Sequence, residues 1–359
     1  MNYLIFRNDG IGDLILSTPL ILAIRNLDPK SKIYLISSMR NNNFAEMLLK
    51  DGLIDEVYLR LTRKDNGQSN LYELYKKLSK ISFEDVFLLK GSTSNLLFSK
   101  MLKAENIFSI ISINEGKIFK SKYSPPLFSK FFLKGIEFID CRNNYMNSSH
   151  LHMSVHFLNL IRLKYNKEIS LTNKYHLPKY LDKYRENYIK ILNSKYNFDI
   201  DKNIIIFHLD EKWNNYNHSF SDIKNCILNL SLMYKSTLII TNGLIENKHE
   251  SKIMKEFDLK IIDTNENIYT SSINKDIIFL PKLTIEKIFF IIELSNLVIT
   301  PHGSLTHIAS LYNKNLIDLI PFEQKDFFLK WKSDNVNSTQ FEIKNLKGVE
   351  AIASKYLKA

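Results

Sequence analysis

The stretch FRNDGIGDLILSTPL, residues 6–20, decides the fold of the N-terminal part of the chain. It follows the apolar run 3–6, which predicts a β-strand, and it leads into an apolar-periodic stretch typical of a helix. Between them, we expect Gly10 and Gly12 to allow positive φ and a close approach of the backbone to a ligand. Asp13 stands at the helix entry, where a carboxylate either stabilises the positive end of the helix dipole or does chemistry.

The loop lacks the dinucleotide-binding pattern G-x-G-x-x-G, because Ile15 stands where the third glycine belongs. A plain NAD site is therefore disfavoured. The pair Thr18–Pro19 follows. Proline is tolerated in the first turn of a helix, so this pair is expected to start or kink the next one.

The chain has 359 residues, of which 45% are hydrophobic and 12% aromatic, enough for two domains with sizeable cores. Its mean hydropathy of −0.17 fits a soluble protein, and no apolar run approaches the ~18 residues of a spanning helix. The short N-terminal apolar run predicts a first strand rather than a signal peptide. Cys141 and Cys226 have no metal-type spacing, so the cytoplasm is the expected compartment.

The net charge is +11, from 49 Lys and Arg against 38 Asp and Glu. Nucleic acid, an anionic membrane surface and an anionic small substrate could each explain it, as could a compositional bias spread over the surface. The basic residues are scattered and form no recognition motif for nucleic acid, so we expect no nucleic-acid partner.

Short apolar runs alternate with helical patterns along most of the chain. The predicted strands are residues 2–6, 33–37, 56–60, 85–90, 107–112, 203–208, 237–241, 259–263, 276–280, 296–300 and 315–320. Strands alternating with helices predict βαβ units. Continuous apolar strands are typical of a parallel sheet covered on both faces.

We therefore predict an α/β fold of two doubly wound, Rossmann-like domains, residues 1–170 and 191–340, joined by a polar linker at 171–190. We expect residues 341–359 to form a closing helix that could pack back on the N-terminal domain. Ligands bind beyond the carboxyl ends of the strands in such sheets, so the predicted site is a cleft between the two domains.

A second candidate loop is TPHGSLTHIAS, residues 300–310, which leaves a predicted strand and opens a helix. A helix N-terminus of this kind accepts phosphate through its backbone N–H groups. We expect the following residues to add donors: His302, Gly303, Ser304, Thr306 and His307. The alternatives are a plain strand-to-helix turn for the loop and a packed structural role for His307.

Two further strand exits carry polar residues. In FHLDEKWNNYNHSF, residues 207–220, Lys212 is a candidate phosphate contact and Trp213 either packs against a base or lines the core. In TNGLIENKHE, residues 241–250, Asn242 and Gly243 are equally compatible with a turn and with a ligand contact.

Two apparent metal signals are discounted. The D-x-D pattern at 199–201 precedes a predicted strand, so it lies at the end of the strand opposite the site and is interpreted as a solvated turn. His152 and His156 have the i, i+4 spacing of a metal pair on a predicted helix, but no further ligand is evident, which favours a structural role.

At these residues the chain resembles the family 9 glycosyltransferases, the bacterial heptosyltransferases of lipopolysaccharide core synthesis. Their opening pattern is a strand, then R-x-x-x-I-G-D, then an apolar stretch with T-P, and it is matched by Arg7, Ile11, Gly12, Asp13, Thr18 and Pro19. TNG and LTIEKIFFIIELSNLVITPHGSLTHIA also follow the order of the family. The resemblance covers most of the chain and is weakest over residues 114–180.

The resemblance implies a GT-B fold, with an acceptor domain followed by a domain that holds the nucleotide sugar. It implies an inverting transfer that uses no metal and no cofactor, with ADP-heptose as the first donor to consider. Asp13 would be the general base that takes a proton from the acceptor hydroxyl, and Arg7, Gly10 and Gly12 would belong to its loop. Lys212 and helix N-termini would meet the charge of the leaving diphosphate.

The implied acceptor is a lipid-linked or oligosaccharide precursor of a surface glycan. The positive net charge suits such an anionic acceptor and leaves a peripheral contact with the inner membrane open.

The sequence departs from the family in the donor half. The family usually has D-[ST]-G-x-x-H in the late loop, whereas here His302 stands for the aspartate, Gly303–Ser304 invert the small pair and His307 matches. Glu211 occupies the position of a lysine that the family places two residues before Trp213. These departures leave the donor sugar and its base open.

Three functions are therefore considered: this transferase with heptose or another nucleotide sugar, an epimerase or NAD enzyme on Rossmann halves, and a non-catalytic module that binds glycan, nucleotide or nucleic acid. The epimerase or NAD alternative would need a complete G-x-G-x-x-G, which the chain lacks.

Overall fold

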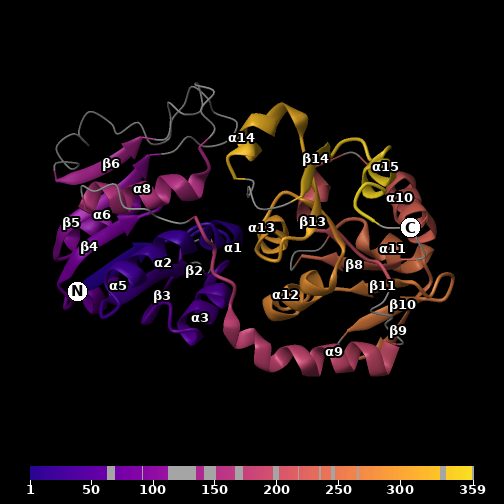
Figure 1. Cartoon of the computed structure of the whole chain (residues 1–359), viewed down its shortest axis with the longest axis horizontal. Helices are drawn as coiled ribbons and strands as arrows, with labels where there is room; N and C mark the ends of the chain where they lie inside the picture. Colours follow the sequence, from indigo (N-terminus) through magenta and orange to yellow (C-terminus); the bar gives the residue numbers. More distant parts are fainter. Residues whose placement is uncertain are drawn as a thin grey trace. The chain divides into compact units, whose positions relative to one another are not determined.

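The structure is a computed structural model that describes residues 1–62, 69–90, 92–111, 135–140, 151–165, 173–196, 202–216, 218–233, 236–243, 247–264, 267–331 and 337–357. It divides into two compact units. Unit 1 contains Met1–Tyr180 and Leu329–Trp331, and unit 2 contains Leu181–Phe328 and Lys332–Ala359. Each unit has its own sheet with helices on both faces, so the predicted α/β fold with two Rossmann-like domains is confirmed (Figure 1). The cleft between the domains stays a prediction.

The sheet of unit 1 has six strands in the order β3-β2-β1-β4-β5-β6, all parallel. This is the strand order of dinucleotide-binding folds, in which the chain reverses direction across the sheet beside the first strand. The strands are β1 (Asn2–Phe6), β2 (Lys32–Ser38), β3 (Glu56–Arg60), β4 (Phe83–Leu88), β5 (Ala104–Ile111) and β6 (Ile136–Asp140).

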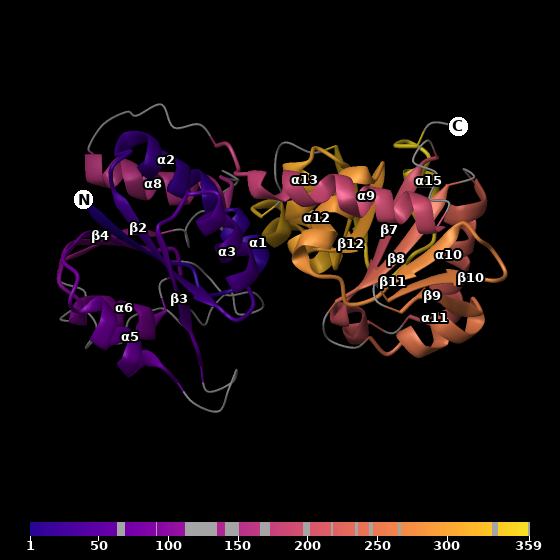
Figure 2. The same ribbon diagram turned by 90° about the horizontal axis from the view of Figure 1, so that it is seen from below.

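Helices cover both faces of this sheet. Figure 2 shows α2 (Thr18–Leu27), α3 (Asn42–Lys50) and α8 (Met153–Tyr165) on one face, and α5 (Leu71–Leu78) and α6 (Thr93–Met101) on the other. The short helix α1 (Ile11–Ile15) precedes α2. Alternate strand residues such as Leu4 and Phe6 pack in the core with α5 and α6, while the neighbouring Ile5 is buried too. Burial on both faces explains why the strands are continuously apolar.

Residues 173–180 stay attached to unit 1. The carboxylate of Asp51 lies 2.7 Å from His176 Nε2 and accepts a hydrogen bond from the backbone N–H of Lys179 at 2.7 Å. The backbone N–H of His176 donates to Thr18 Oγ1 at 3.0 Å. The boundary between the units, after Tyr180, thus falls inside the segment expected to be the linker, and the rest of that segment belongs to unit 2.

The sheet of unit 2 has eight strands in the order β14-β13-β12-β7-β8-β11-β10-β9. Its strands are β7 (Ile204–Leu209), β8 (Thr237–Asn242), β9 (Leu259–Asp263), β10 (Ile268–Ser271), β11 (Ile277–Leu280), β12 (Leu297–Pro301), β13 (Asn315–Ile320) and β14 (Ser338–Glu342). Its helices are α9 (Asp182–Tyr196), α10 (Phe220–Met233), α11 (Glu250–Glu256), α12 (Ile285–Leu294), α13 (Ser304–Leu311), α14 (Lys325–Leu329) and α15 (Val349–Ala353). Its short 3₁₀ helices are η3 (Glu211–Asn215) and η4 (Phe322–Gln324), while η2 (Lys179–Leu181) spans the boundary between the units.

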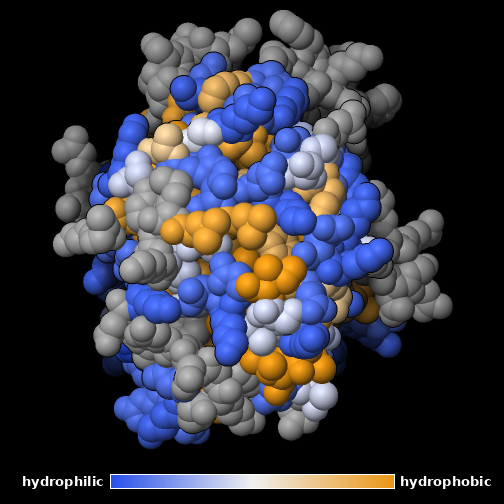
Figure 3. All heavy atoms as spheres, turned by 90° about the vertical axis from the view of Figure 1, so that its right-hand side faces the viewer, coloured by the Kyte–Doolittle hydropathy of each residue, from blue (hydrophilic) through white to orange (hydrophobic). Residues whose placement is uncertain are grey.

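Strand β9 corrects one prediction, since we expected it in a fully parallel sheet covered on both faces. It is an edge strand, and β10 pairs antiparallel with both β9 and β11. Ile261 and Ile262 are each 44% exposed there. An apolar run alone does not distinguish an edge strand from a central one. On the face seen in Figure 3, hydrophobic groups lie interspersed with hydrophilic ones.

The C-terminal segment differs from its expected position on the N-terminal domain. Leu346, Val349, Ala353 and Leu357 are buried in the core of unit 2, where they pack with residues of α10 such as Ile227. The reason is local, because β14 extends the sheet of unit 2 and delivers α15 directly onto the same face as α10.

In the part of the chain that the structure describes, none of the helices combines the length and the apolar character needed to cross a membrane.

Candidate functional site

Arg7 organises the loop that follows β1. It is only 2% exposed, and its guanidinium lies 4.9 Å from the centre of the Phe157 ring of α8. Nη1 donates to the backbone carbonyl of Leu89 at 2.6 Å, at the end of the neighbouring strand β4. Nε donates to the backbone carbonyl of Asp13 and Nη2 to its carboxylate, both at 3.0 Å. A planar, permanently charged group thus fixes both the backbone and the side chain of Asp13.

Asp13 is held with part of its carboxylate accessible. Oδ1 accepts from Arg7 and Oδ2 accepts from the backbone N–H of Gly10 at 3.1 Å, while the side chain remains 32% exposed. Carboxylate oxygens have further lone pairs, so both oxygens can still accept a proton or a hydrogen bond. This arrangement suits a group that must be positioned and still reach a ligand.

The glycines of this loop do not act through positive φ, which corrects the expectation. Gly10 is extended, with φ −86° and ψ 167°, and Gly12 is buried in α1 and is not among the described residues with positive φ. Gly10 instead provides room, because a Cβ atom there would lie 3.1 Å from Asp13 Oδ2. The close approach of backbone to side chain is the reason for glycine at position 10.

Asp9 is a residue of this site that the sequence analysis missed. Its Oδ1 lies 3.2 Å from Arg7 Nε and its Oδ2 lies 4.0 Å from Lys90 Nζ, so it shares the guanidinium with Asp13. The pKa of Asp9 is raised to about 6, mainly by burial and also by the charge of Asp13, while Arg7 and Lys90 act in the opposite direction. Its position directly after a strand, between Arg7 and Gly10, was the available signal.

These groups lie at the topological switch point of unit 1. The Arg7–Asp13 loop leaves the carboxyl end of β1, and Lys90 follows β4, its neighbour in the sheet. Connections from β1 and β4 run to opposite faces, which opens a crevice for ligands in doubly wound folds.

The second group of polar residues lies at the switch point of unit 2, between β7 and β12. Lys212, in η3 after β7, donates from Nζ to the backbone carbonyl of His302 at 2.5 Å and lies 3.3 Å from Asp210 Oδ2. Its side chain is 40% exposed. Gly303 leaves room for this contact, since a Cβ atom at position 303 would overlap the ammonium group.

A buried carboxylate supports the loop after β12. Asp318 of β13 is fully buried, and its two oxygens accept from His302 Nδ1 at 2.8 Å and from Thr306 Oγ1 at 3.0 Å. Thr306 Oγ1 also accepts from the backbone N–H of Gly303 at 3.1 Å. The sequence analysis missed Asp318, which lies within the apolar run NLIDLI, where only a tertiary contact reveals its role.

The other predicted donor-site residues lie at the same edge of the sheet with different degrees of access. Ser304 is half-buried at the first turn of α13, whereas His307 is 5% exposed and its ring centre lies 5.4 Å from that of His302. Asn242 is 3% exposed, and its amide donates to Glu250 at 2.8 Å and accepts from the backbone N–H of Lys282 at 2.7 Å. The geometry of Asn242 is thus that of a residue stabilising the end of β8.

Gly243 lies beside the acidic residues of the β7 exit. A Cβ atom there would be 3.0 Å from Glu211 Oε2 and 3.5 Å from the Cβ of Asp210. His208, at the end of β7, is buried and bonded through Nδ1 to Thr241 Oγ1 at 2.8 Å. Burial, aided by the charge of Lys212, lowers its pKa to about 3, so it is neutral near pH 7.

Trp213 belongs to the core. It is fully buried, packs on Phe207 and donates from Nε1 to the backbone carbonyl of His208 at 3.0 Å. His156 in α8 and His152, the residue before that helix, are likewise buried, and His152 Nδ1 lies 2.7 Å from Ser154 Oγ. Among the described residues, no three His, Cys, Asp or Glu side chains form a group that could hold a metal ion. The D-x-D segment 199–201 and Cys141 lie outside the described residues.

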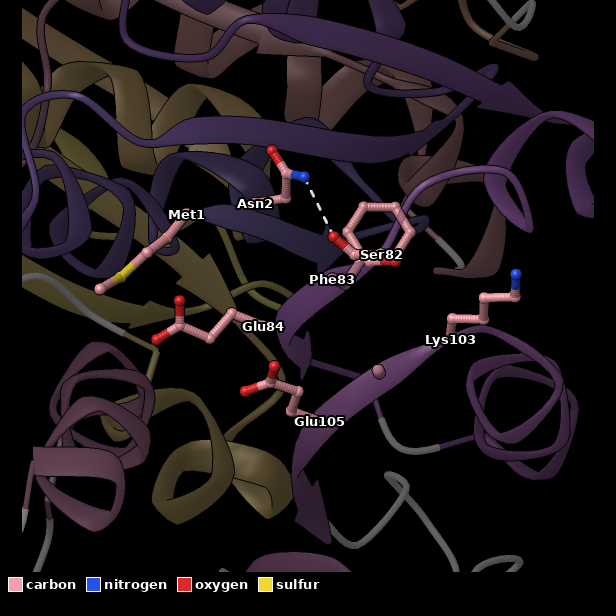
Figure 4. A pocket seen from close by; sticks show the side chains of 8 residues that line it. Met1, Asn2, Ser82, Phe83, Glu84, Lys103 and Glu105 are labelled. Atoms are coloured by element: carbon pink, nitrogen blue, oxygen red, sulfur yellow. Dashed lines mark hydrogen bonds between the residues drawn. The ribbon is translucent and has the colours of Figure 1, made fainter.

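A hollow of about 430 Å³ lies at the amino ends of the strands of unit 1, opposite the end where the Arg7–Asp13 loop leaves the sheet (Figure 4). It is lined at the amino ends of β1, β4 and β5, where Asn2 Nδ2 donates to the backbone carbonyl of Ser82 at 3.0 Å. Glu84 and Glu105 border it. It is therefore separate from the Arg7–Asp13 loop, which leaves the carboxyl end of β1.

No family model matches the chain, and no curated protein matches its sequence. Solved structures do match along 99% of its length. A family 9 glycosyl transferase from Veillonella parvula matches with a TM-score of 0.65 and 12% identity, over 90% of that chain. The ADP-heptose lps heptosyltransferase II of E. coli matches with a TM-score of 0.65 and 12% identity. The structure of the E. coli heptosyltransferase WaaC with ADP matches with a TM-score of 0.62 and 11% identity. Each match covers 98% of the E. coli chain.

At these identities the similarity concerns the fold. The similarity to the family 9 glycosyltransferases predicted from the motifs is thus confirmed as a similarity of fold, and the chain has the GT-B fold. A UDP-GlcNAc 2-epimerase from Methanocaldococcus jannaschii matches as well, with a TM-score of 0.52 and 14% identity over 92% of that chain.

Proposed function

We propose that the chain is an inverting, metal-independent glycosyltransferase that moves a sugar from a nucleotide diphosphate donor to a surface-glycan acceptor. Heptose from ADP-heptose is the first donor to test, and a lipopolysaccharide or lipooligosaccharide precursor is the first acceptor. The observation that carries the proposal is a pair of polar sites, each at the topological switch point of a Rossmann-like sheet. One contains a carboxylate clamped by arginine, and the other contains a lysine and a histidine suited to phosphate.

In the proposed reaction, Asp13 accepts the proton of an acceptor hydroxyl while the hydroxyl oxygen forms a bond to the anomeric carbon. The bond between that carbon and the diphosphate breaks on the opposite face of the sugar, so the configuration inverts. Arg7 and the backbone N–H of Gly10 hold the Asp13 carboxylate during this step. Lys212 and the first turn of α13 stabilise the charge that develops on the leaving diphosphate.

The similarity of solved structures supports the donor class. The E. coli heptosyltransferase WaaC is known in structures with ADP and with ADP-2-deoxy-2-fluoro heptose. The departures at His302 and Glu211 lie in the donor half, so a different nucleotide sugar is the alternative within the same reaction. The positive net charge suits an anionic acceptor at the inner face of the membrane, where a cytoplasmic protein would meet it.

A thermal-shift screen against ADP-, GDP-, UDP- and CDP-linked sugars tests the proposal. A ligand that binds the folded state raises the melting temperature, so a rise specific to one nucleotide supports a donor site. Release of the nucleoside diphosphate from that sugar, measured with and without EDTA, then tests catalysis and the absence of a metal requirement. Binding without release of the diphosphate would favour a non-catalytic module, and an epimerised nucleotide sugar would favour an epimerase of the same fold.

A further inference from the structure

We propose that Asp318 orients His302 so that its second ring nitrogen binds the diphosphate of the donor together with Lys212. This inference rests on the proposed function and deepens it, since it assigns a donor-binding residue and a positioning residue within unit 2. The hydrogen bonds of His302 and Asp318 involve Lys212 after β7 and Thr306 after β12. These residues lie at the carboxyl edge of the sheet of unit 2, and Asp318 itself lies on the neighbouring strand β13.

The buried carboxylate decides which nitrogen of His302 is available. Asp318 is fully buried and its Oδ2 lies 2.8 Å from His302 Nδ1. An ionised carboxylate only accepts hydrogen bonds, so Nδ1 must carry a proton. Nε2 is then the nitrogen left for a ligand: it accepts when the ring is neutral and donates when the ring is charged.

The ring of His302 is held on several sides. Its centre lies 4.5 Å from the ring centre of Phe328 in α14 and 5.4 Å, edge to face, from that of His307 in α13. In the described part of the chain, its side-chain hydrogen bond is the one to Asp318. A side chain fixed by packing and by one hydrogen bond presents its remaining nitrogen without the entropy cost of ordering a mobile group.

Lys212 brings an ammonium group to the same loop. Its Nζ donates to the backbone carbonyl of His302, and the missing Cβ of Gly303 makes room for it. The lysine comes from the β7 side of the switch point and the imidazole lies on the β13 side of β12. An ammonium group and an imidazole that flank the start of α13 suit a ligand with two adjacent negative charges, which a nucleoside diphosphate diester carries.

The charged and titratable groups facing His302 are Asp318 from β13, Lys212 and Asp210 from the β7 exit, and His307 from α13, while α14 presents the uncharged ring of Phe328. A hydrogen bond donated from Nε2 adds to the contact that Lys212 makes with the diphosphate, so removing the imidazole should weaken binding of the donor.

The test is calorimetric titration of the full chain with ADP-heptose, ADP-glucose, GDP-mannose and UDP-glucose. His302→Gln is expected to bind the best of these probes about tenfold more weakly than wild type. His302→Lys, which keeps a charged donor at this position, is expected to bind within about threefold of wild type.

Asp318→Asn tests the positioning role, because it keeps the shape and removes the charge that fixes the tautomer. The expected result is that probe affinity falls about tenfold, whereas Asp318→Glu, which keeps the carboxylate, stays closer to wild type. His176→Gln is the matched control, since it removes another histidine paired with an aspartate, Asp51 of unit 1, at 2.7 Å. It is expected to bind the probe like wild type.

Probe binding that is unchanged in His302→Gln, or in Asp318→Asn, overturns this inference and leaves the proposed donor site standing. If wild type binds none of the probes, ADP-heptose included, the proposed function is overturned and the inference with it. If His302→Gln fails to fold, the affinities of Asp318→Asn and Asp318→Glu decide the question.

Discussion

Replacing Asp9 with asparagine should stabilise unit 1 at neutral pH. Asp9 is buried beside Arg7 and Asp13, and burial raises its pKa from 3.8 to about 6. In the window between these values the native state binds more protons than the unfolded state, so the contribution of Asp9 to stability falls as pH rises. Asparagine has a similar shape and no charge to desolvate, and Arg7 keeps its ion pair with Asp13.

The size of the effect follows from the pKa. A shift of about two units at about 1.4 kcal/mol each corresponds to about 3 kcal/mol once Asp9 is fully ionised in both states. Only part of this is present near pH 5, so the gain from Asp9→Asn should grow by an amount on the order of 1 kcal/mol between about pH 5 and about pH 7.5. The pKa of Asp9 already includes the favourable ion pair with Arg7, so the loss of that pair in Asp9→Asn does not change the direction of the effect on stability.

The assay is urea unfolding at the two pH values. In a Trp213→Phe background, the fluorescence of Trp331 reports on unit 1, which contains Asp9. Asn8→Ala is the control, because it alters the same loop without removing a titratable group, and its effect should be equal at both pH values. A gain from Asp9→Asn that is constant or shrinks as pH rises would refute the reasoning from burial.

Two further substitutions separate the site from the scaffold. Gly10→Ala places a Cβ atom 3.1 Å from Asp13 Oδ2, so the carboxylate must move by a few tenths of an ångström; we expect turnover to fall about tenfold while calorimetry shows unchanged donor affinity. Asp85→Asn removes the charge of a fully buried carboxylate that pairs with Lys164 of α8; we expect a loss of about 1–3 kcal/mol in urea unfolding with unchanged nucleotide binding. Reduced donor affinity in Gly10→Ala, or unchanged stability in Asp85→Asn, would contradict these assignments.

The parts of the fold that sequence patterns predict best are the central strands. β1 and β12 are continuously apolar because helices cover both faces of each sheet, and periodicity detects this directly. The strands β6, β10 and β14 were missed, since they lie at or near sheet edges and mix polar with apolar residues. Pairing with a neighbour far away in the sequence, rather than local pattern, makes these segments strands.

The candidate site shows the same division. Asp13 follows a strand of unit 1, and Lys212 and His302 follow strands of unit 2, so their positions at the carboxyl edge of each sheet could be predicted from topology alone. The importance of Asp9 comes from burial beside a shared arginine, and that of Asp318 from a hydrogen bond to a residue sixteen positions earlier. Neither property is encoded in local spacing, so only the folded chain reveals them.

The most direct test of the proposed function compares Asp13→Asn with wild type for release of the nucleoside diphosphate from the sugar that raises the melting temperature. A general base typically contributes about 10²–10⁴ in rate, so the account predicts a loss of at least about a hundredfold with unchanged donor affinity. Asp28→Asn is the control, because its carboxylate lies 3.5 Å from Tyr3 Oη, away from the Arg7–Asp13 loop. Turnover of Asp13→Asn within about threefold of wild type would contradict the assignment of Asp13 as the base.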